Sequence, residues 1–245
     1  MKIASFSLSD VGRVRRENQD SSGHFPDRNL FVVADGMGGH QGGKQASEMA
    51  VATIAERLAT HVDGGPLDER TRRLVDAVQD ANRRILERGA RESDLNRMGT
   101  TLVALLLEQD EAAIVHVGDS RAYRWRDGRL SQLTTDHTLV ADLLRANEIS
   151  EAEASTHPYR HVLTRALGSA EEVTADVRRL DVQAGDVYLL CSDGVSGMLG
   201  ESEIATIAGA HHDDPEALSR ELIAAANQAG GKDNATVIVV RCAAD

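Results

Sequence analysis

The stretch Leu30-Phe31-Val32-Val33-Ala34-Asp35-Gly36 is an apolar run that ends in an aspartate followed by a glycine. Its composition predicts a strand, and because no polar residues alternate with the apolar ones, we expect both faces of that strand to be buried. Apolar runs end similarly at Val117-Gly118-Asp119-Ser120 and Cys191-Ser192-Asp193-Gly194, and Gly231-Lys232-Asp233-Asn234 leads into the last one. A single Asp-Gly pair is typical of a turn, as we expect at Asp127-Gly128. The repetition at buried strand ends predicts a functional cluster.

Carboxylates at the ends of buried strands are costly unless an opposite charge neutralises them. The chain has only three lysines, Lys2, Lys44 and Lys232, which form no comparable set of cations near these positions. Oxygen ligands beside glycines suit a hard divalent cation, Mg²⁺ or Mn²⁺, better than zinc or copper. Two such ions bridged by one carboxylate would activate a water for in-line attack on phosphorus. The aspartates therefore predict a divalent-metal site.

The order of the predicted elements favours an α+β layered fold, because strands and helices are grouped and do not alternate strictly. A hairpin is expected over Arg121 to Leu133, around the turn at Asp127-Gly128. The remaining strands are expected at 30–34, 102–107, 113–117, 187–191 and 236–240, and the helices at 45–59, 68–91, 138–146 and 215–228.

The length of 245 residues fits one large domain. Between about Asp136 and Leu180 the strand pattern lapses, which predicts an insertion over the surface of the domain. We therefore expect a single domain over residues 1–245 with a flap around 136–180.

The charge balance excludes two classes of partner. Asp and Glu number 39 against 27 Lys and Arg, a net charge of -12, and an acidic surface repels nucleic acid and anionic lipid. The only cysteines, Cys191 and Cys242, lie in apolar runs, so no disulfide framework is expected. The longest apolar run, Leu102 to Leu107, is too short to span a bilayer. We expect a cytoplasmic protein, with no receptor or membrane anchor after its last strand.

Two other patterns are weaker candidates. The glycine-rich segment Gly36 to Lys44 lacks the ending that a nucleotide-binding P-loop requires. His157 and His161 have the spacing of a zinc pair, but Pro158 lies between them and no cysteine is near. Close packing explains the first pattern better, and a structural role the second.

Six segments resemble, in order, the motifs of the metal-dependent Ser/Thr protein phosphatases of type 2C, in their bacterial form. Together they span Arg15 to Val240, nearly the whole chain. The segments are Arg15-Arg16-Glu17-Asn18-Gln19-Asp20, Val33-Ala34-Asp35-Gly36-Met37-Gly38-Gly39-His40, Met98-Gly99-Thr100-Thr101, Val117-Gly118-Asp119-Ser120-Arg121, Ser192-Asp193-Gly194 and Gly231-Lys232-Asp233-Asn234-Ala235-Thr236.

The resemblance implies a four-layer fold, with a central β-sandwich of two antiparallel sheets flanked by pairs of antiparallel helices. It implies hydrolysis of phosphoserine and phosphothreonine on proteins, with two Mn²⁺ or Mg²⁺ ions in a cleft and a third, weaker ion. Asp35 would bridge the first two ions, the Gly36 carbonyl would bind one, and Asp193 and Asp233 would complete the other. Asp119, together with Asp193, would bind the third ion.

Three further residues acquire roles from the resemblance. Asp20 would hold metal-bound waters from behind the ligands. Arg15 would clamp the substrate phosphate, a role that suits its planar fork of donors. His40 would be the general acid that protonates the departing serine or threonine oxygen.

Phosphorylated proteins are the implied substrates, and a Ser/Thr kinase is the implied counterpart; we expect a monomer and no further cofactor. One alternative is a phosphatase-like binding or sensor module without catalysis, which the presence of Asp35, Asp193 and Asp233 argues against. A dedicated phosphatase for one serine-phosphorylated regulator in a partner-switching pathway also stays open.

Overall fold

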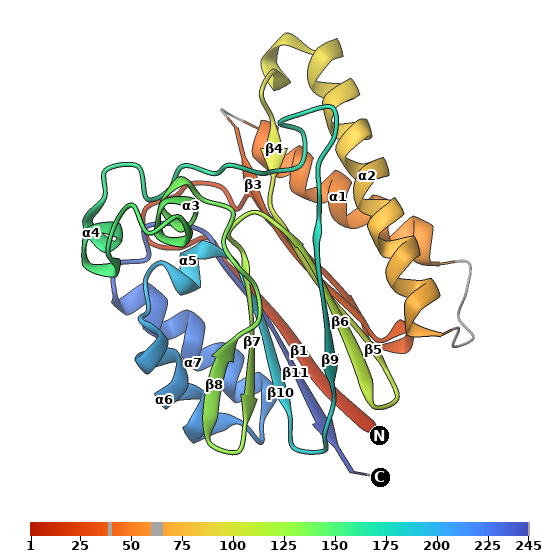
Figure 1. Ribbon diagram of the computed structural model, residues 1–245, viewed down its shortest axis with the longest axis vertical. Coiled ribbons are helices and arrows are strands. Elements are labelled where there is room, and N and C mark those ends of the chain that lie inside the picture. Colours follow the sequence, from red (N-terminus) through yellow and green to blue (C-terminus); the bar gives the residue numbers. More distant parts are fainter. Residues whose placement is uncertain (39–40, 60–65, 245) are drawn as a thin grey trace.

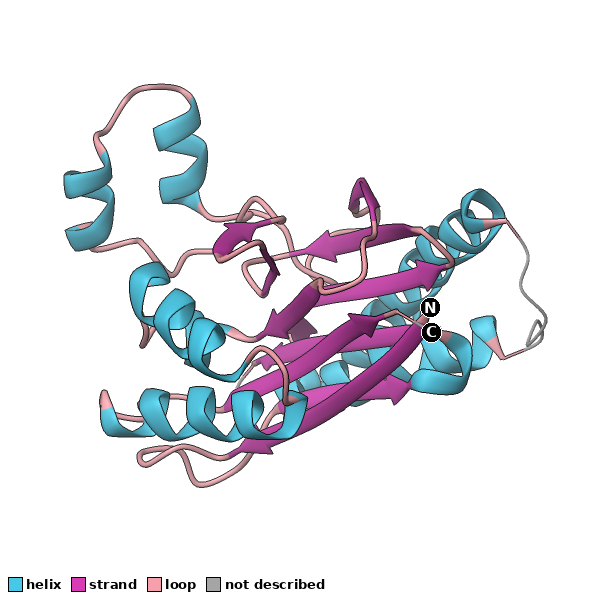
Figure 2. Ribbon diagram, turned by 90° about the horizontal axis from the view of Figure 1, so that it is seen from below, coloured by secondary structure: helices cyan, strands magenta, loops and turns pink. Residues whose placement is uncertain are grey.

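Two antiparallel β-sheets lie face to face and helices cover both outer surfaces, as the computed structural model of residues 1–38, 41–59 and 66–244 shows (Figures 1 and 2). Helices α1 and α2 cover one sheet, and α6 and α7 cover the other. The four-layer arrangement predicted from the sequence is confirmed.

Every strand pairing in the two sheets is antiparallel. The first sheet has the order β1 (Lys2–Asp10), β11 (Ala235–Ala243), β10 (Val187–Cys191), β7 (Arg121–Arg126) and β8 (Arg129–Gln132). The second has the order β2 (Asp20–Phe25), β3 (Leu30–Met37), β5 (Leu102–Glu108), β6 (Glu111–Val117) and β9 (Asp176–Asp181), with the short β4 (Gly99–Thr100) paired to β3.

Strand β3 shows why the central strands are apolar throughout. Leu30 and Val32 pack against α1 and α2, whereas Phe31 and Val33 point into the core between the sheets. Successive side chains alternate between the faces of a strand, so a strand covered on both sides needs apolar residues at every position. The continuous apolar runs in the sequence follow from this burial.

The helices occupy three places. On the outer faces lie α1 (Gly42–Leu58), α2 (Leu67–Arg91), α6 (Glu201–His211) and α7 (Pro215–Gln228); at one end of the sandwich lie the short α3 (Leu139–Arg145), α4 (Glu151–Thr156) and α5 (Asp193–Ser196). Single 3₁₀ turns occur at Pro26–Arg28 and Ser93–Leu95. Helix α7 begins where predicted because Pro215 occupies its first turn and Asp214 accepts hydrogen bonds from two of its free amides.

The flap is shorter than the sequence predicts. Residues 176–180 were predicted to belong to the flap, but they form most of strand β9, which pairs with β6 along the edge of the second sheet. Its residues are largely exposed and alternate weakly, so the sequence carried little strand signal. Strands β1 and β2 were also missed: they lack the continuous apolar runs from which the inner strands were predicted, although Ser5-Phe6-Ser7-Leu8-Ser9 alternates polar and apolar residues, as a half-buried strand does.

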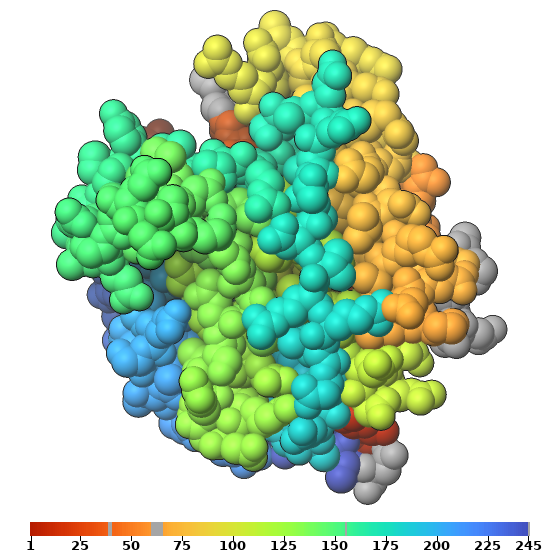
Figure 3. Space-filling view, viewed as in Figure 1, coloured from red at the N-terminus to blue at the C-terminus, as the bar shows by residue number. Residues whose placement is uncertain are grey.

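The segment between β8 and β9 crosses the surface near one end of the sandwich, and the chain termini lie at the other end (Figure 1). After the flap helices α3 and α4, the chain packs beside α2 (Figure 3), where Asn82 accepts a hydrogen bond from the Gly168 amide and donates one to the Ala170 carbonyl. None of the described helices combines the length and the apolar character needed to cross a bilayer.

Candidate active site

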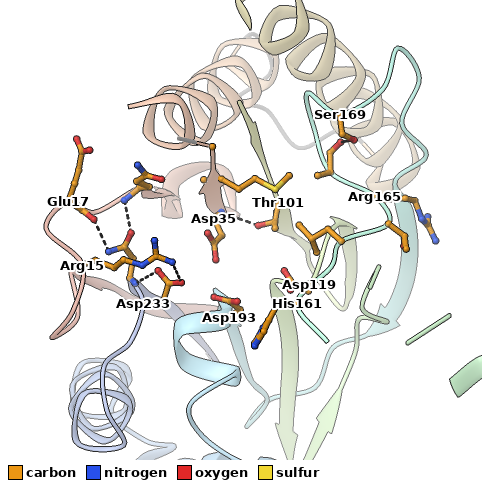
Figure 4. Close-up of a pocket in the computed structure, with 18 of the residues that line it drawn as sticks. Arg15, Glu17, Asp35, Thr101, Asp119, His161, Arg165, Ser169, Asp193 and Asp233 are labelled. Atoms are coloured by element: carbon orange, nitrogen blue, oxygen red, sulfur yellow. Dashed lines mark hydrogen bonds and ion pairs between the residues drawn. The ribbon is translucent and has the colours of Figure 1, made fainter. Parts of the chain in front are cut away.

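A cleft of about 840 Å³ opens at the flap end of the sandwich, and aspartates from both sheets meet there (Figure 4). Asp35, Asp119, Asp193 and Asp233 lie around one space, although they come from distant parts of the sequence. The cleft residues that the sequence singled out are Arg15, Asp35, Gly36, Asp119, Asp193 and Asp233. The structure therefore brings together six of the eight predicted site residues.

Asp35 and Asp20 are neighbours because β2 and β3 pair with these two residues in register. The Gly36 amide donates to the Gln19 carbonyl at 3.2 Å, and a Cβ at position 36 would lie 2.1 Å from the Gly43 carbonyl oxygen. Only glycine allows this approach of α1 to the end of β3. The last residues of β3 line the cleft.

The other aspartates occupy connections at strand ends. Asp119 lies in the turn by which the chain passes from β6 in one sheet to β7 in the other. Asp193 begins α5 directly after β10, and Asp233 directly precedes β11. Because β10 and β11 are paired neighbours, these two carboxylates enter the cleft side by side from the first sheet.

Burial and mutual repulsion make the proton-bound forms of these carboxyl groups more favourable. Burial raises the pKa of Asp119 to about 7, and the nearby Asp193 charge adds to this effect. Burial also raises the pKa of Asp193, followed by the charge of Asp233. The pKa of Asp35 lies well above its usual range because of burial and then the charge of Asp20. Bound cations would stabilise the ionised form of such a group of buried carboxylates.

Asp20 lies behind the cleft and is held by two hydroxyl groups. Its Oδ2 accepts hydrogen bonds from Ser192 Oγ at 2.7 Å and Thr236 Oγ1 at 2.6 Å. Burial raises its pKa to about 7, against the effect of these two hydrogen bonds. Its Oδ1 is buried and has no hydrogen-bond partner among the described residues. A buried oxygen of this kind is expected to have a partner, such as water.

Arg15 brings a positive charge to the rim of the cleft. Its Nη2 donates to Asp233 Oδ2 at 2.6 Å, and its side chain is 54% exposed. Asp233, Asp35 and Asp193 together raise the pKa of the guanidinium group, first through the hydrogen bond to Asp233. An exposed fork of donors beside the aspartates can reach an anion that enters the cleft.

Three residues of this site had no role predicted from the sequence. Thr101 Oγ1 accepts from the Asp35 amide at 3.0 Å and contacts Ser120 Oγ at 2.6 Å, so it links the segments that carry Asp35 and Asp119. Asn234 Nδ2 donates to the Val11 carbonyl at 2.9 Å and also anchors the loop that carries Arg15. Both residues lie inside the quoted motifs, and this position was the signal in the sequence that could have identified them. The third, His161, was predicted to be structural, but it is exposed and lines the cleft.

The other two predicted residues are Asp20 and His40. Asp20 pairs with Asp35 across β2 and β3 but does not line the cleft. His40, predicted to be the general acid, lies outside the described residues.

Comparisons with known proteins agree with this geometry. Residues 13–230 match the family described as protein phosphatase 2C. The chain is 40% identical over 235 residues to the serine/threonine phosphatase stp of Listeria monocytogenes, an alignment that covers 95% of this chain and 93% of the relative. It is similar to the crystal structure of the Mycobacterium tuberculosis serine/threonine phosphatase PstP/Ppp, with a TM-score of 0.89, 36% identity and 99% coverage of both chains.

The catalytic domain of PstP has also been solved in complex with two manganese ions. That structure superimposes with a TM-score of 0.88 at 36% identity and covers 99% of both chains. The cleft of this chain offers aspartates and a backbone carbonyl for such ions. The chain therefore belongs to the protein phosphatase 2C family of metal-dependent serine/threonine phosphatases.

Proposed function

We propose that this cleft hydrolyses phosphoserine and phosphothreonine on proteins, with Asp35, Gly36, Asp193 and Asp233 holding two divalent cations. The observation that carries the proposal is the meeting of Asp35, Asp193 and Asp233 with the exposed guanidinium of Arg15 in one cleft. The ions would supply a water of lowered pKa and positive charge to stabilise the transferred phosphoryl group.

The residues present fit such ions. All the donors are oxygens, which Mg²⁺ and Mn²⁺ prefer, and bound cations would remove the repulsion that raises the pKa of Asp35 and Asp193. The unpartnered Oδ1 of Asp20 would accept a hydrogen bond from a water on an ion. Asp119, on the opposite side of Asp193 from Arg15 (Figure 4), would hold a third, weaker ion together with Asp193.

The test of this function is an assay of the protein with p-nitrophenyl phosphate and with a phosphothreonine peptide, in Mn²⁺ and then in excess EDTA. We expect turnover of both substrates with Mn²⁺, loss of turnover in EDTA and recovery when Mn²⁺ is restored. Undiminished turnover in EDTA would contradict the metal mechanism. Binding of Mn²⁺ without turnover of any phosphopeptide would indicate the alternative, a binding module that lacks catalysis.

Arg15 is proposed to bind the substrate phosphate with the donors that its contact to Asp233 leaves exposed. We expect Arg15→Ala to lower kcat/KM for the phosphothreonine peptide about 10-fold to 100-fold, the effect of losing charge-assisted hydrogen bonds to an anion. Arg15→Lys should recover only part of this loss, because an ammonium group cannot form the planar fork. The matched control is Arg13→Ala, since Arg13 lies in the same loop but does not line the cleft. Equal kcat/KM in the Arg13 and Arg15 variants would contradict the assignment.

The flap is proposed to contribute to the choice of substrate. A groove of about 510 Å³ runs between the flap helices and α5 and shares Asp119, His161 and Asp193 with the cleft. Val140 and Leu144 on one side of the groove, with Met198 and Leu199 on the other, form an apolar lining. A protein segment with its phosphorylated residue in the cleft would reach this groove.

The remaining assignments concern the general acid, the kinase that opposes this protein, its oligomeric state and its location. The general acid role of His40 stays a prediction from the sequence. We further propose that a Ser/Thr kinase supplies the phosphorylated substrates, and that the protein acts in signal transduction as a monomer. A cytoplasmic location is supported by its two buried free thiols, Cys191 and Cys242.

A further inference from the structure

Two consecutive residues, Asp136 and His137, form hydrogen bonds with the turn that carries Asp119. The Arg121 guanidinium, two residues after Asp119, donates to both carboxylate oxygens of Asp136 at 2.7 to 3.2 Å. Gly118, one residue before Asp119, donates its amide proton to His137 Nδ1 at 3.0 Å and accepts from the His137 amide at 3.0 Å. Asp119 is therefore held from both sides by the start of the flap.

Thr101 packs against the opposite side of the same turn. Gly118 has a φ of +100°, and a Cβ there would lie 2.7 Å from Thr101 Cβ. The turn thus lies between Thr101 on one side and the imidazole of His137 on the other. A glycine backbone is flexible because it has no side chain. The hydrogen bond to His137 therefore restricts the orientation of the Gly118 amide.

The hydrogen bonds of His137 define its protonation. Nδ1 accepts from an amide, so the neutral ring carries its proton on Nε2, which faces Asp176 Oδ2 at 3.4 Å. Asp176 is in turn paired with Arg165, which lines the cleft, at 2.6 Å. Burial lowers the pKa of His137 to about 4, in agreement with a neutral ring.

His116, His137 and Asp176 also form a group whose potential ligand atoms lie within 4.8 Å of one another. The hydrogen bonds argue against a metal ion there. His137 Nδ1 is occupied by the Gly118 amide and its Nε2 carries the proton. His116 Nε2 lies 2.9 Å from the Thr135 carbonyl oxygen, to which it must donate. The two rings are stacked with centroids 4.7 Å apart, and each is hydrogen-bonded to a different backbone group, which is a structural arrangement.

We propose that His137 is a positioning residue, whose Nδ1 orients the Gly118 amide and thereby holds the Asp119 carboxylate at the cleft for its cation. Its carbonyl oxygen accepts from the Thr164 amide at 2.8 Å, so the same residue joins the Asp119 turn to the far end of the flap. The inference rests on the proposed role of Asp119 as a ligand of the third ion.

Three variants of His137 test the role of Nδ1. Asparagine carries Oδ1 on Cγ, the position of Nδ1 in histidine, and can accept from Gly118. Glutamine carries its polar atoms farther out, where Nε2 lies, and alanine carries none. We expect His137→Gln and His137→Ala to weaken the weakest Mn²⁺ site about 10-fold to 100-fold, as for other outer-shell partners of metal ligands, and His137→Asn to stay within about threefold of the parent.

The measurements are calorimetric Mn²⁺ titration and, in the metal-free protein, the hydrogen-exchange rate of the Gly118 amide. Exchange should be faster in the glutamine and alanine variants and close to the parent rate in the asparagine variant, because only a hydrogen-bonded amide is protected. This second readout is independent of catalysis and of bound metal. Should the alanine variant fail to fold, the comparison of asparagine with glutamine still decides.

His116→Ala is the matched control, because it removes the stacked, buried ring and leaves both Gly118 bonds in place. We expect it to preserve Mn²⁺ affinity. Asp119→Asn is the reference for loss of the ligand itself. If Asp119→Asn weakens the third site while His137→Gln does not, or if His116→Ala weakens it as much as His137→Ala, the positioning role is wrong. If Asp119→Asn leaves all Mn²⁺ binding intact, the ligand role of Asp119 and this inference both fail.

Discussion

Asp193→Asn is expected to lower kcat/KM for a phosphothreonine peptide about 1,000-fold in Mn²⁺, equivalent to about 4 kcal/mol of transition-state stabilisation. The amide keeps the size of the carboxylate but removes the negative charge that would hold an ion of the core pair and also the third ion. The loss should be accompanied by weaker Mn²⁺ binding in a calorimetric titration. Because Asp193 starts α5 at the centre of the cleft, no neighbouring carboxylate can replace it without movement.

Asp127→Asn is a matched control for this variant. Asp127 also precedes a glycine, but it lies in the exposed β7–β8 turn with a φ of 50°, which asparagine adopts readily. We expect its activity and Mn²⁺ affinity to equal those of the parent. The melting temperature of metal-free Asp193→Asn should not fall, because a buried charge has been removed. Activity near the parent value in Asp193→Asn would overturn the proposed ligand set.

The stability of the metal-free protein is expected to depend on the ionisation of Asp119. Its pKa is about 7 in the folded chain, against about 3.9 in an unfolded one. Between these values the folded state holds the proton while the unfolded state has lost it, so stability falls as pH rises and the full penalty is present above pH 7. Asp119→Asn removes this penalty. We expect its free energy of unfolding to exceed the parent's by on the order of 2 kcal/mol at pH 8 and by little at pH 4.

Urea unfolding of both proteins in EDTA, at pH values from 4 to 8, measures this difference. The comparison of variant with parent is needed because His116 and His137, whose pKa values burial lowers, act in the opposite direction at acid pH. Mn²⁺ should stabilise the parent more than the variant at pH 8, since an ion that binds only the folded state adds to its stability. A difference in unfolding free energy that is the same at pH 4 and pH 8 would contradict the raised pKa.

The sequence predicted the inner strands and the site best where local pattern and burial agree. Runs such as those ending at Asp35 and Asp193 are apolar at every position because both faces of their strands are covered. The edge strand β9 and the polar strand β1 carry no such pattern. Their conformation depends on hydrogen bonds to partners distant in the chain, β1 with β11 for example, and a local reading does not detect these.

The sequence by itself determined the layered fold, the strand-end aspartates and the chemistry that their oxygens favour, because hydrophobic pattern and residue type are properties of short segments. Only the tertiary structure decided which supports meet these residues. It placed Asn234 under the Arg15 loop, Thr101 between Asp35 and Ser120, and His137 against Gly118. These contacts join residues up to 223 positions apart, and each depends on the relative placement of two elements, which hydrogen bonding and packing across the whole molecule set.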